Sequence, residues 1–294
     1  MLKISTQTDI FTNHFSDREI VDMLFDAGFD AIDYSFFDVS RCDPEKGDAE
    51  YKKRFTELRK YAEDKGLYFN QSHAPHPSSL TDEAFTKRRF DELVTSLKNS
   101  SYLGVRNIII HPLQHLRYYT NENTEALYEM NLDFFARLIP YCEQYGITIC
   151  TENMWQCYGD SSRIWDSVCA RAEEFVRYID GVNSPYLRAC VDIGHTVLVG
   201  ENPVRMIEAL GSRVAALHVH DNDGARDVHT VPFHGIVKWN EVARSLKKIG
   251  YSGEITLEAG GFMSSGSIPP ELYPDCARYM AKTARTFAKM VEEA

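Results

Sequence analysis

The stretch Tyr145-Gly-Ile-Thr-Ile-Cys-Thr-Glu152 is one copy of a pattern that recurs along the chain. A glycine ends a helical segment, a short β-rich run follows, and the run ends on a polar side chain. Runs of this kind are expected as strands at Leu2–Thr6, Ala31–Ser35, Leu67–Ser72, Asn107–His111, Ile147–Glu152, Arg188–Asp192, Val214–His220 and Glu254–Glu258. Helical periodicity predicts helices over residues 17–28, 48–65, 82–103, 124–145, 166–180, 203–211, 239–249 and 272–292.

Eight alternations of strand and helix are the number found in a closed (β/α)8 barrel. An open doubly wound sheet would instead need a glycine-rich phosphate turn after the first strand, and Ser5–Phe15 contains no glycine. We therefore predict an α/β protein, a single-domain (β/α)8 TIM barrel over residues 1–294. The glycine- and serine-rich loop Gly260–Pro270, after the last strand, is predicted to be a mobile cover over a site.

The chain carries 43 acidic and 32 basic side chains, a formal net charge of −11, which disfavours binding to nucleic acid or to an anionic membrane surface. We expect a small-molecule partner instead. The 7 cysteines form no CxxC pair, which is typical of a reduced intracellular chain. The polar N-terminal residues leave no room for the apolar core of a signal peptide, and no apolar run approaches the roughly 18 residues that span a bilayer. A cytoplasmic location is therefore expected.

Histidines and carboxylates gather at the C-terminal ends of the expected strands, where the active sites of such barrels lie. In chain order these residues are His73, His111, Glu152, Asp192, His195, His218, Asp227, His229 and Glu258. Any one of them alone is more often a hydrogen-bonding loop residue than a functional one. Together they predict one polar site at the mouth of the barrel.

Carboxylates that end apolar strands would point into the barrel mouth, and their burial is costly unless a positive charge neutralises them. Glu152, Asp192, His218 and Glu258 supply three oxygens and one nitrogen, a ligand set that suits a divalent cation. Mn²⁺ is favoured, and Mg²⁺, Co²⁺ and Zn²⁺ are compatible with the same ligands. The remaining coordination positions would accept two oxygens of a substrate.

Several short motifs resemble those of a known family. They are His73-Ala-Pro, Ile110-His-Pro112, Thr151-Glu-Asn153, Val191-Asp-Ile-Gly-His195, Leu217-His-Val-His-Asp-Asn-Asp-Gly224, Asp227-Val-His229, and Gly250-Tyr-Ser-Gly253 leading to Leu257-Glu258. In this order they resemble the xylose isomerase-like barrels, which include sugar phosphate isomerases and epimerases, ketose 3-epimerases, inosose dehydratases and apurinic endonucleases. The resemblance covers nearly the whole chain, and it is specific for the superfamily but not for the reaction.

The epimerase branch implies a metal-dependent isomerase or epimerase that acts on a small sugar, sugar phosphate or polyol-ketone. A homo-oligomer is a separate expectation. The resemblance implies metal ligands at Glu152, Asp192, His218 and Glu258. Glu152 and Glu258 would also be the catalytic pair that moves a proton next to the substrate carbonyl through an enediolate. Substrate contacts are expected from His73, His111, His195, Asp227, His229 and Arg226, where Arg226 would replace an arginine that ketose 3-epimerases align near Gly224.

Two departures leave the substrate open. Tyr158 stands where ketose 3-epimerases carry a second glutamate, and Pro232-Phe-His-Gly235 replaces a Pro-Gly-x-Gly turn. An apurinic-endonuclease-type zinc phosphodiesterase is the main alternative, since its three-metal ligands match all nine strand-end residues named above. Against it stand the charge of −11 and the sequence that follows Asp192. An inosose-type dehydratase and a non-catalytic metal or carbohydrate binding protein are further alternatives.

Overall fold

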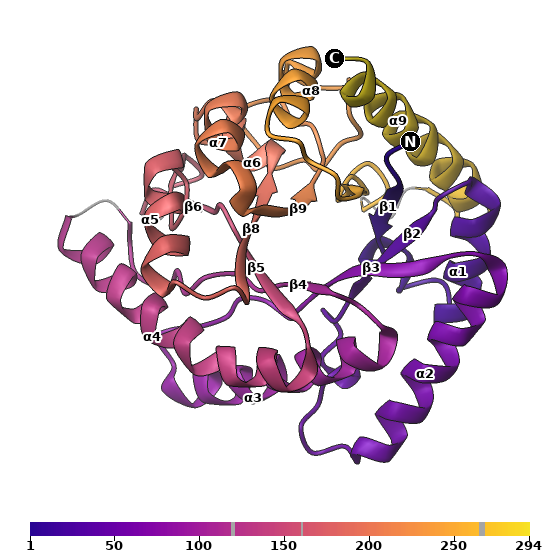
Figure 1. Cartoon of the computed structure of the whole chain (residues 1–294), viewed down its shortest axis with the longest axis horizontal. Helices are drawn as coiled ribbons and strands as arrows, with labels where there is room; N and C mark the ends of the chain where they lie inside the picture. Colours follow the sequence, from indigo (N-terminus) through magenta and orange to yellow (C-terminus); the bar gives the residue numbers. More distant parts are fainter. Residues whose placement is uncertain (119–120, 160, 265–267) are drawn as a thin grey trace.

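Strands and helices alternate around a closed ring in the computed structural model of the chain (Figure 1). The structure describes residues 1–118, 121–159, 161–264 and 268–294. Eight parallel strands form one sheet in the order β10-β1-β2-β3-β4-β5-β8-β9. Their bounds are β1 Ile4–Gln7, β2 Ala31–Ser35, β3 Tyr68–His73, β4 Asn107–Ile109, β5 Thr148–Glu152, β8 Leu187–Asp192, β9 Val214–His218 and β10 Ile255–Leu257.

The ring closes between β9 and β10, which stand at the two ends of this order. Val219 pairs with Leu257 in a parallel bridge. The Val219 N–H donates to the carbonyl of Thr256 (2.9 Å), and the Glu258 N–H donates to the carbonyl of Val219 (3.3 Å). The predicted (β/α)8 TIM barrel is therefore confirmed.

Helices surround the sheet, and most begin and end where the sequence predicts. Their bounds are α1 Asp17–Ala27, α2 Asp48–Lys65, α3 Glu83–Leu103, α4 Asn121–Tyr145, α5 Ala172–Val182, α6 Ile193–Leu198, α7 Pro203–Leu210, α8 Trp239–Lys248 and α9 Tyr273–Glu293. Ser16 and Glu19 form a capping box at the start of α1, and Gly28 ends that helix at φ 90°, which a residue with a Cβ rarely adopts. The fold also contains 3-10 turns at η1 Asp9–Phe11, η2 Val39–Arg41, η3 Gly211–Arg213 and η4 Pro270–Leu272.

One predicted helix starts in the wrong place. The helix expected over 166–180 begins at Ala172, because the preceding residues form an antiparallel pair of strands, β6 Trp155–Cys157 and β7 Ile164–Asp166. The Arg171 guanidinium donates twice to the Asp166 carboxylate (2.7 Å each), which fixes the chain between this hairpin and α5. The short helix α6, directly after β8, was also not predicted.

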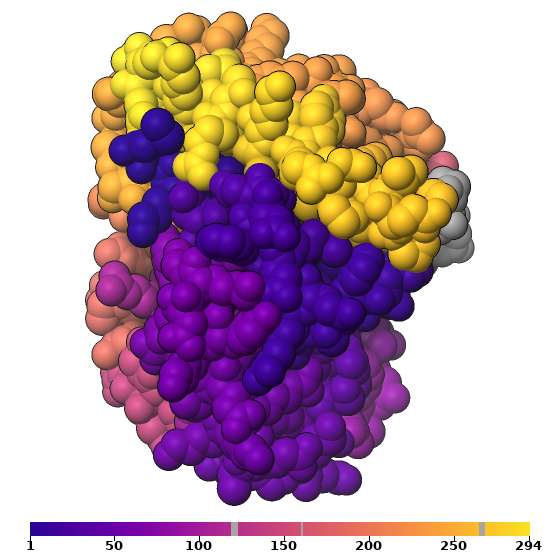
Figure 2. Space-filling view, turned by 90° about the vertical axis from the view of Figure 1, so that its right-hand side faces the viewer, coloured from indigo at the N-terminus to yellow at the C-terminus, as the bar shows by residue number. Residues whose placement is uncertain are grey.

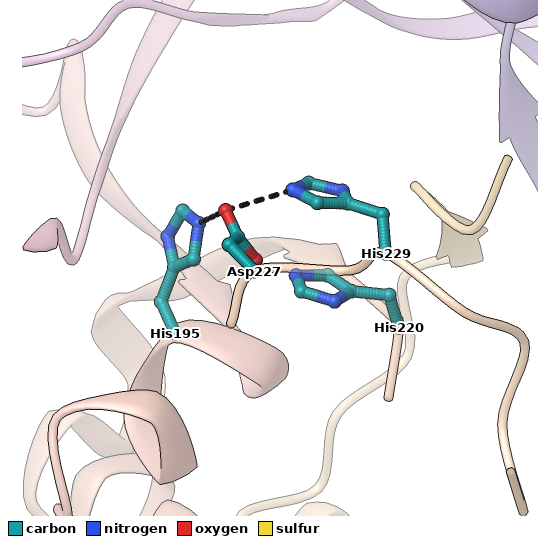
Figure 3. A group of neighbouring side chains, drawn as sticks. All are labelled: His195, His220, Asp227 and His229. Atoms are coloured by element: carbon teal, nitrogen blue, oxygen red, sulfur yellow. Dashed lines mark hydrogen bonds and ion pairs between the residues drawn. The ribbon is translucent and has the colours of Figure 1, made fainter. Parts of the chain in front are cut away.

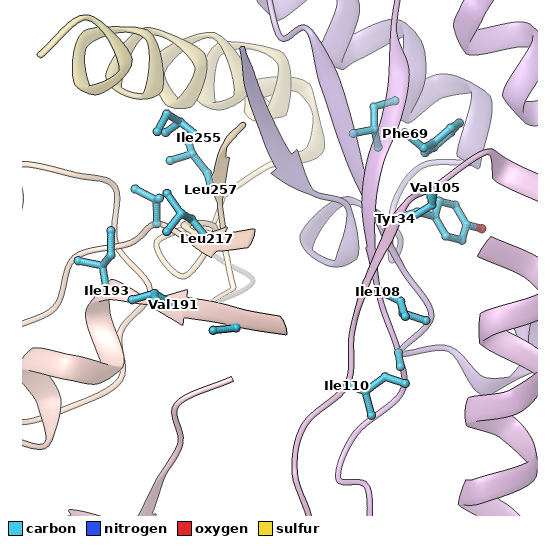
Figure 4. Packing of buried hydrophobic residues seen from close by; sticks show 14 of the residues in the cluster. Tyr34, Phe69, Val105, Ile108, Ile110, Val191, Ile193, Leu217, Ile255 and Leu257 are labelled. Carbon is cyan, nitrogen blue, oxygen red and sulfur yellow. The ribbon is translucent and has the colours of Figure 1, made fainter. Parts of the chain in front are cut away.

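The hydrophobic core lies between the outward faces of the strands and the helices (Figure 4). Fully buried members of this layer include Ile108, Val191, Leu217 and Leu257. The inside of the barrel is more polar: the Ser5 hydroxyl donates to Thr256 (2.7 Å), and the Gln71 amide donates to Asp33 (2.9 Å). The strands thus carry an apolar exterior, while the interior combines these polar side chains with a small apolar cluster of Ile109, Cys150, Cys190 and Ala216.

The C-terminal helix packs beside the start of the chain, as Figure 2 shows by its yellow and indigo surfaces lying together. The Leu2 N–H donates to the carboxylate of Glu292 near the end of α9. Within the described residues, no helix combines the length and the apolar character that a membrane span needs. Part of the predicted cover loop, residues 265–267, lies outside the described residues.

Candidate functional site

A cavity of about 700 Å³ opens at the C-terminal ends of the strands. This is a volume that accommodates a small ligand. Its polar lining residues are Thr6, Gln7, Asp9, His73, His76, His111, Gln114, Glu152, Trp155, His195, Asp227, His229, Glu258 and Ser264. The described part of the lining also contains apolar side chains, among them Phe37 and Met154.

Four side chains meet at the floor of this cavity: Glu152 and Glu258 line it, and Asp192 and His218 lie buried directly against them. His218 Nδ1 lies 2.8 Å from Glu258 Oε2, 3.3 Å from Glu152 Oε2 and 4.0 Å from Asp192 Oδ2. One ligand atom from each of these residues lies within 4.8 Å of the others. Ligands of a divalent cation at bond lengths of about 2.1 Å are separated by roughly 3–4 Å, so the spacing fits a single ion.

The donor atoms in this group also fit a cation. Glu152 Oε2 and both ring nitrogens of His218 are buried and have no hydrogen-bond partner. Buried polar atoms without partners are rare, and here they belong to a set of three carboxylates and one imidazole. A bound divalent ion would satisfy these lone pairs and offset the concentrated negative charge.

The local fold holds Asp192 rigidly. Asp192 is the last residue of β8 and the N-cap of α6, so its Oδ1 accepts the His195 N–H (2.6 Å). His220 Nε2 lies 3.0 Å from its Oδ2. Asn153, one residue beyond the end of β5, bonds to both backbone groups of Asp192.

A second group lies beside the first, formed by His195, His220, Asp227 and His229 (Figure 3). Asp227 Oδ2 accepts from His195 Nε2 (3.2 Å), from His229 Nε2 (3.0 Å) and from the Trp155 indole (3.0 Å). The His220 and His229 rings stack with centroids 4.0 Å apart. Asp227 therefore joins two histidines and an aromatic wall of the cavity.

A third group adjoins Glu152 on the side away from Asp192. His111 Nε2 lies 3.3 Å from Glu152 Oε2, and His73 Nε2 lies 4.0 Å from the same oxygen. His73 Nδ1 lies 2.8 Å from the carbonyl of Ala74, to which it donates. Its Nε2 then presents a lone pair toward a carboxylate oxygen, an arrangement that also favours a shared cation or a water molecule.

The charges in the site shift the ionisation of its members. Burial alone would raise the pKa of Glu152, but His218, His111 and His195 hold it well below its usual range. Burial alone would lower the pKa of His195, yet Asp192, Asp227 and Glu152 raise it. The pKa of His229 is raised to about 10 against its burial, mainly by Asp227. At the rim, burial and Glu258 raise the pKa of Asp9 to about 6. Perturbed groups gathered in one cavity mark it as a candidate functional site.

The structure brings together most of the residues that the sequence suggested. The metal-ligand candidates share one cluster, and His73, His111, His195, Asp227 and His229 all line the cavity. Arg226 is not brought to it: its guanidinium pairs with Asp223 at 2.7 Å, and its side chain is 77% exposed. Asp223 explains this placement, because it accepts hydrogen bonds from both the backbone N–H and the guanidinium of Arg226 within one exposed turn.

Several residues of the site were not singled out from the sequence. Asp9 and His76 line the cavity, while Asn153, His220 and Asp33 support the cluster from behind. Asn153 directly follows Glu152, and His220 lies two residues after His218. This closeness to candidate metal ligands could have identified both as site residues. Asp9 follows β1 and Asp33 lies within β2. Neither strand carries a histidine at its end, so the sequence pattern gave no signal for these two residues.

Comparison with known proteins places this geometry in context. A sequence model described as "Xylose isomerase-like TIM barrel" matches residues 21–283. A protein of Methanocaldococcus jannaschii is 30% identical over 193 residues, which cover 63% of this chain and 62% of that protein. A protein of Sinorhizobium fredii is 26% identical over 174 residues, which cover 56% of this chain and 52% of that protein. The chain thus spans less than two thirds of the length of these two relatives.

Other matches extend over more of the chain. The D-psicose 3-epimerase of Enterocloster bolteae is 22% identical over 268 residues, 88% of this chain and 81% of that enzyme. Among solved structures, the IolI protein with a bound zinc atom is similar with a TM-score of 0.75 at 18% identity, over 99% of both chains. At this identity the structural likeness establishes the fold.

Proposed function

Because the chain belongs to the xylose isomerase-like TIM barrel family, we propose that it is a metal-dependent isomerase or epimerase of a small sugar or polyol-ketone. The observation that carries the proposal is the convergence of Glu152, Asp192, His218 and Glu258 at the floor of the cavity, with buried lone pairs that lack partners. The named epimerase among the relatives supports the same reaction class.

The proposed chemistry uses the two glutamates as a proton-moving pair. They come from β5 and from the residue after β10, strands that are not neighbours in the ring, so they reach a substrate from different sides. One carboxylate removes the proton from the carbon next to the carbonyl, and the other returns a proton to the resulting enediolate. A divalent cation held by the four ligands would stabilise the negative charge that develops on the substrate oxygens.

The remaining cavity residues bind and orient the substrate. His195 and His229 each contact Asp227 through Nε2 and a backbone carbonyl through Nδ1, that of Asn153 and that of Glu258 respectively, so they fix the Asp227 carboxylate in the cavity wall. Trp155 and Phe37 provide apolar walls against which a sugar ring or chain packs. We propose Mn²⁺ as the preferred ion because the set is rich in oxygen ligands, with Zn²⁺ next since the IolI structure contains it.

The charge of the cavity argues for a substrate without phosphate. In the described part of the chain, no lysine or arginine lines it, whereas Asp9, Glu152, Asp227 and Glu258 do. Burial, and then the neighbouring His111, lower the pKa of His76 to about 4, so that ring supplies no positive charge at neutral pH. A phosphate dianion would meet four carboxylates and no lysine or arginine, and the charges of His195 and His229 are already paired with Asp227.

The second candidate is the phosphodiesterase of the apurinic-endonuclease type. It is favoured by the three adjoining groups, because His73 and His111 extend the cluster on one side and Asp227 with His229 extend it on the other. The lack of lysine and arginine in the described lining, together with the charge of −11, weighs against a nucleic acid substrate. An inosose dehydratase would use the same metal ligands and stays a third possibility within the same chemistry.

A substrate panel tests the proposal. Metal-free protein is loaded with Mn²⁺, Mg²⁺, Co²⁺ or Zn²⁺ and incubated with free ketoses, ketose phosphates, inososes and a duplex containing an abasic site. We expect conversion of a free ketose that depends on added metal, with no conversion of its phosphate. Nicking of the abasic duplex with about three zinc ions per chain, and no conversion of any sugar, would replace this function with the second candidate.

A further inference from the structure

A buried carboxylate lies behind the candidate metal ligands and does not line the cavity. Asp33, in the middle of β2, is fully buried. Its Oδ2 accepts the Gln71 amide at 2.9 Å, and its Oδ1 has no hydrogen-bond partner. A buried carboxylate oxygen without a partner lowers stability. We therefore looked for a function of Asp33 outside the cavity lining.

The imidazole of His218 faces Asp33. His218 Nε2 lies 3.8 Å from Asp33 Oδ2, whereas Nδ1 on the opposite side of the ring faces Glu258 and Glu152. Neither ring nitrogen has a hydrogen-bond partner. A shift of about 1 Å would bring Nε2 and Asp33 to hydrogen-bond distance.

We propose that Asp33 is a positioning residue that holds His218 in the tautomer with hydrogen on Nε2. In that tautomer Nδ1 carries the lone pair and is the nitrogen that binds the cation. A histidine ligand is commonly oriented in this way by a carboxylate on its other nitrogen. The inference rests on the metal site of the proposed function, and it adds which nitrogen binds and which residue selects it.

Replacement by asparagine reverses the preference. In Asp33→Asn, the negative charge that favours hydrogen on Nε2 is lost. Because Oδ2 both accepts the Gln71 amide and faces His218, an amide nitrogen in its place gives up the Gln71 bond and presents an N–H to His218 Nε2. That nitrogen then acts as an acceptor, and the ring hydrogen moves to Nδ1, where it blocks the cation. The substitution keeps the size of the side chain and removes a buried negative charge, which offsets the lost Gln71 bond, so we expect no net loss of stability.

The test measures metal affinity rather than activity. Mn²⁺ and Zn²⁺ binding to wild type and D33N is determined by competition with a chromophoric chelator, and unfolding of the metal-free proteins is followed in urea. We expect D33N to bind each ion 10- to 100-fold more weakly, a range typical of such outer partners, with a urea midpoint at or above that of wild type. Affinity within about twofold of wild type in folded D33N would overturn the proposal.

Asp30 provides a matched control, since it lies just before the same strand and bonds to the Ile4 N–H and to Arg285 instead. D30N should lose stability and keep its metal affinity. A purely structural role for Asp33 would give D33N that same result. If wild type itself binds neither ion, the proposed metal site fails together with this inference, whereas equal binding by wild type and D33N removes only the role of Asp33.

A measurement on the unaltered protein covers the case in which D33N does not fold. Long-range ¹H–¹⁵N correlation spectra of the zinc-loaded wild type report which nitrogen of each histidine carries hydrogen. We expect His218 to show hydrogen on Nε2 and a metal-bound Nδ1. Hydrogen on Nδ1 of His218 would contradict the proposal.

Discussion

Asn153, one residue beyond β5, and Asp192, the last residue of the adjacent β8, exchange two hydrogen bonds: the Asn153 amide donates to the Asp192 carbonyl (2.9 Å), and the Asp192 N–H donates to Asn153 Oδ1 (2.8 Å). This pairing continues the β5–β8 ladder through a side chain, at the point where both strands deliver a candidate metal ligand. It therefore couples the stability of the barrel to the geometry of the site.

Asn153→Ala should be among the more damaging single changes near the site. It leaves the buried N–H of Asp192 without a partner and removes one of the bonds to its C=O, and we expect a loss of about 1–3 kcal/mol in unfolding free energy. Urea unfolding of the metal-free protein measures this loss. Asn107→Ala, which removes one long bond of 3.4 Å, is the control and should cost less. Equal losses for the two variants would show that the Asn153–Asp192 pairing contributes no more to the unfolding free energy than a single long hydrogen bond.

Gly194→Ala should displace His220. A Cβ at position 194 would overlap the His220 ring, which stacks on His229 and bonds to Asp192. We expect a destabilisation of about 1–3 kcal/mol, as for other overpacked positions, together with weaker metal binding. Gly47→Ala is the matched control, because a Cβ there meets nothing within 4 Å. The prediction fails if both glycine variants melt at the same temperature as wild type.

Glu174, which lies outside the candidate site, should make the unfolding free energy depend on pH. Burial raises the pKa of Glu174 to about 8, from 4.5 for an ordinary glutamate. The folded protein thus binds a proton that the unfolded chain has released, so this contribution is full below pH 4.5 and is lost as pH rises through 8. Glu174→Gln should flatten the fall in stability between pH 5 and 8 and make the protein more stable at pH 8.5. Urea titrations at several pH values measure it, and an unchanged slope would refute the assignment.

Arg226→Ala should leave the reaction unaffected. The arginine is exposed and bonds within its own turn to Asp223, so it contributes no contact in the cavity as described. We expect kcat/KM within about twofold of wild type on whichever ketose is converted. A loss of tenfold or more, seen mainly in KM, would mean that the turn rearranges and brings Arg226 onto the bound substrate.

The barrel and the metal-ligand cluster could be predicted from sequence because the same local rules repeat. Each strand is short and β-rich, glycines such as Gly28 end the helices, and polar residues such as Glu152 follow at the strand ends. Parallel strands in a closed ring then bring those ends together without further information.

Other features depend on contacts that no local pattern encodes. The residues around Ile164–Asp166 form a strand only because Trp155–Cys157 lies opposite, so a helical reading of residue 166 onward was wrong. Arg226 was predicted in the site because ketose 3-epimerases align an arginine near Gly224, but here it bonds to Asp223 within an exposed turn. Asp33 gave no signal, since its role depends on His218 from a strand far along the chain.

The central claim is that Glu152 and Glu258 move a proton next to a substrate carbonyl, and solvent isotope exchange tests it most directly. Metal-loaded protein is incubated in D₂O with a converted ketose, and deuterium at the carbon beside the carbonyl is measured by NMR for wild type, E152Q and E258Q. The account predicts incorporation by wild type and a loss of at least about 100-fold in each folded variant. Conversion of the ketose by wild type without deuterium incorporation, or full exchange in both variants, would contradict it.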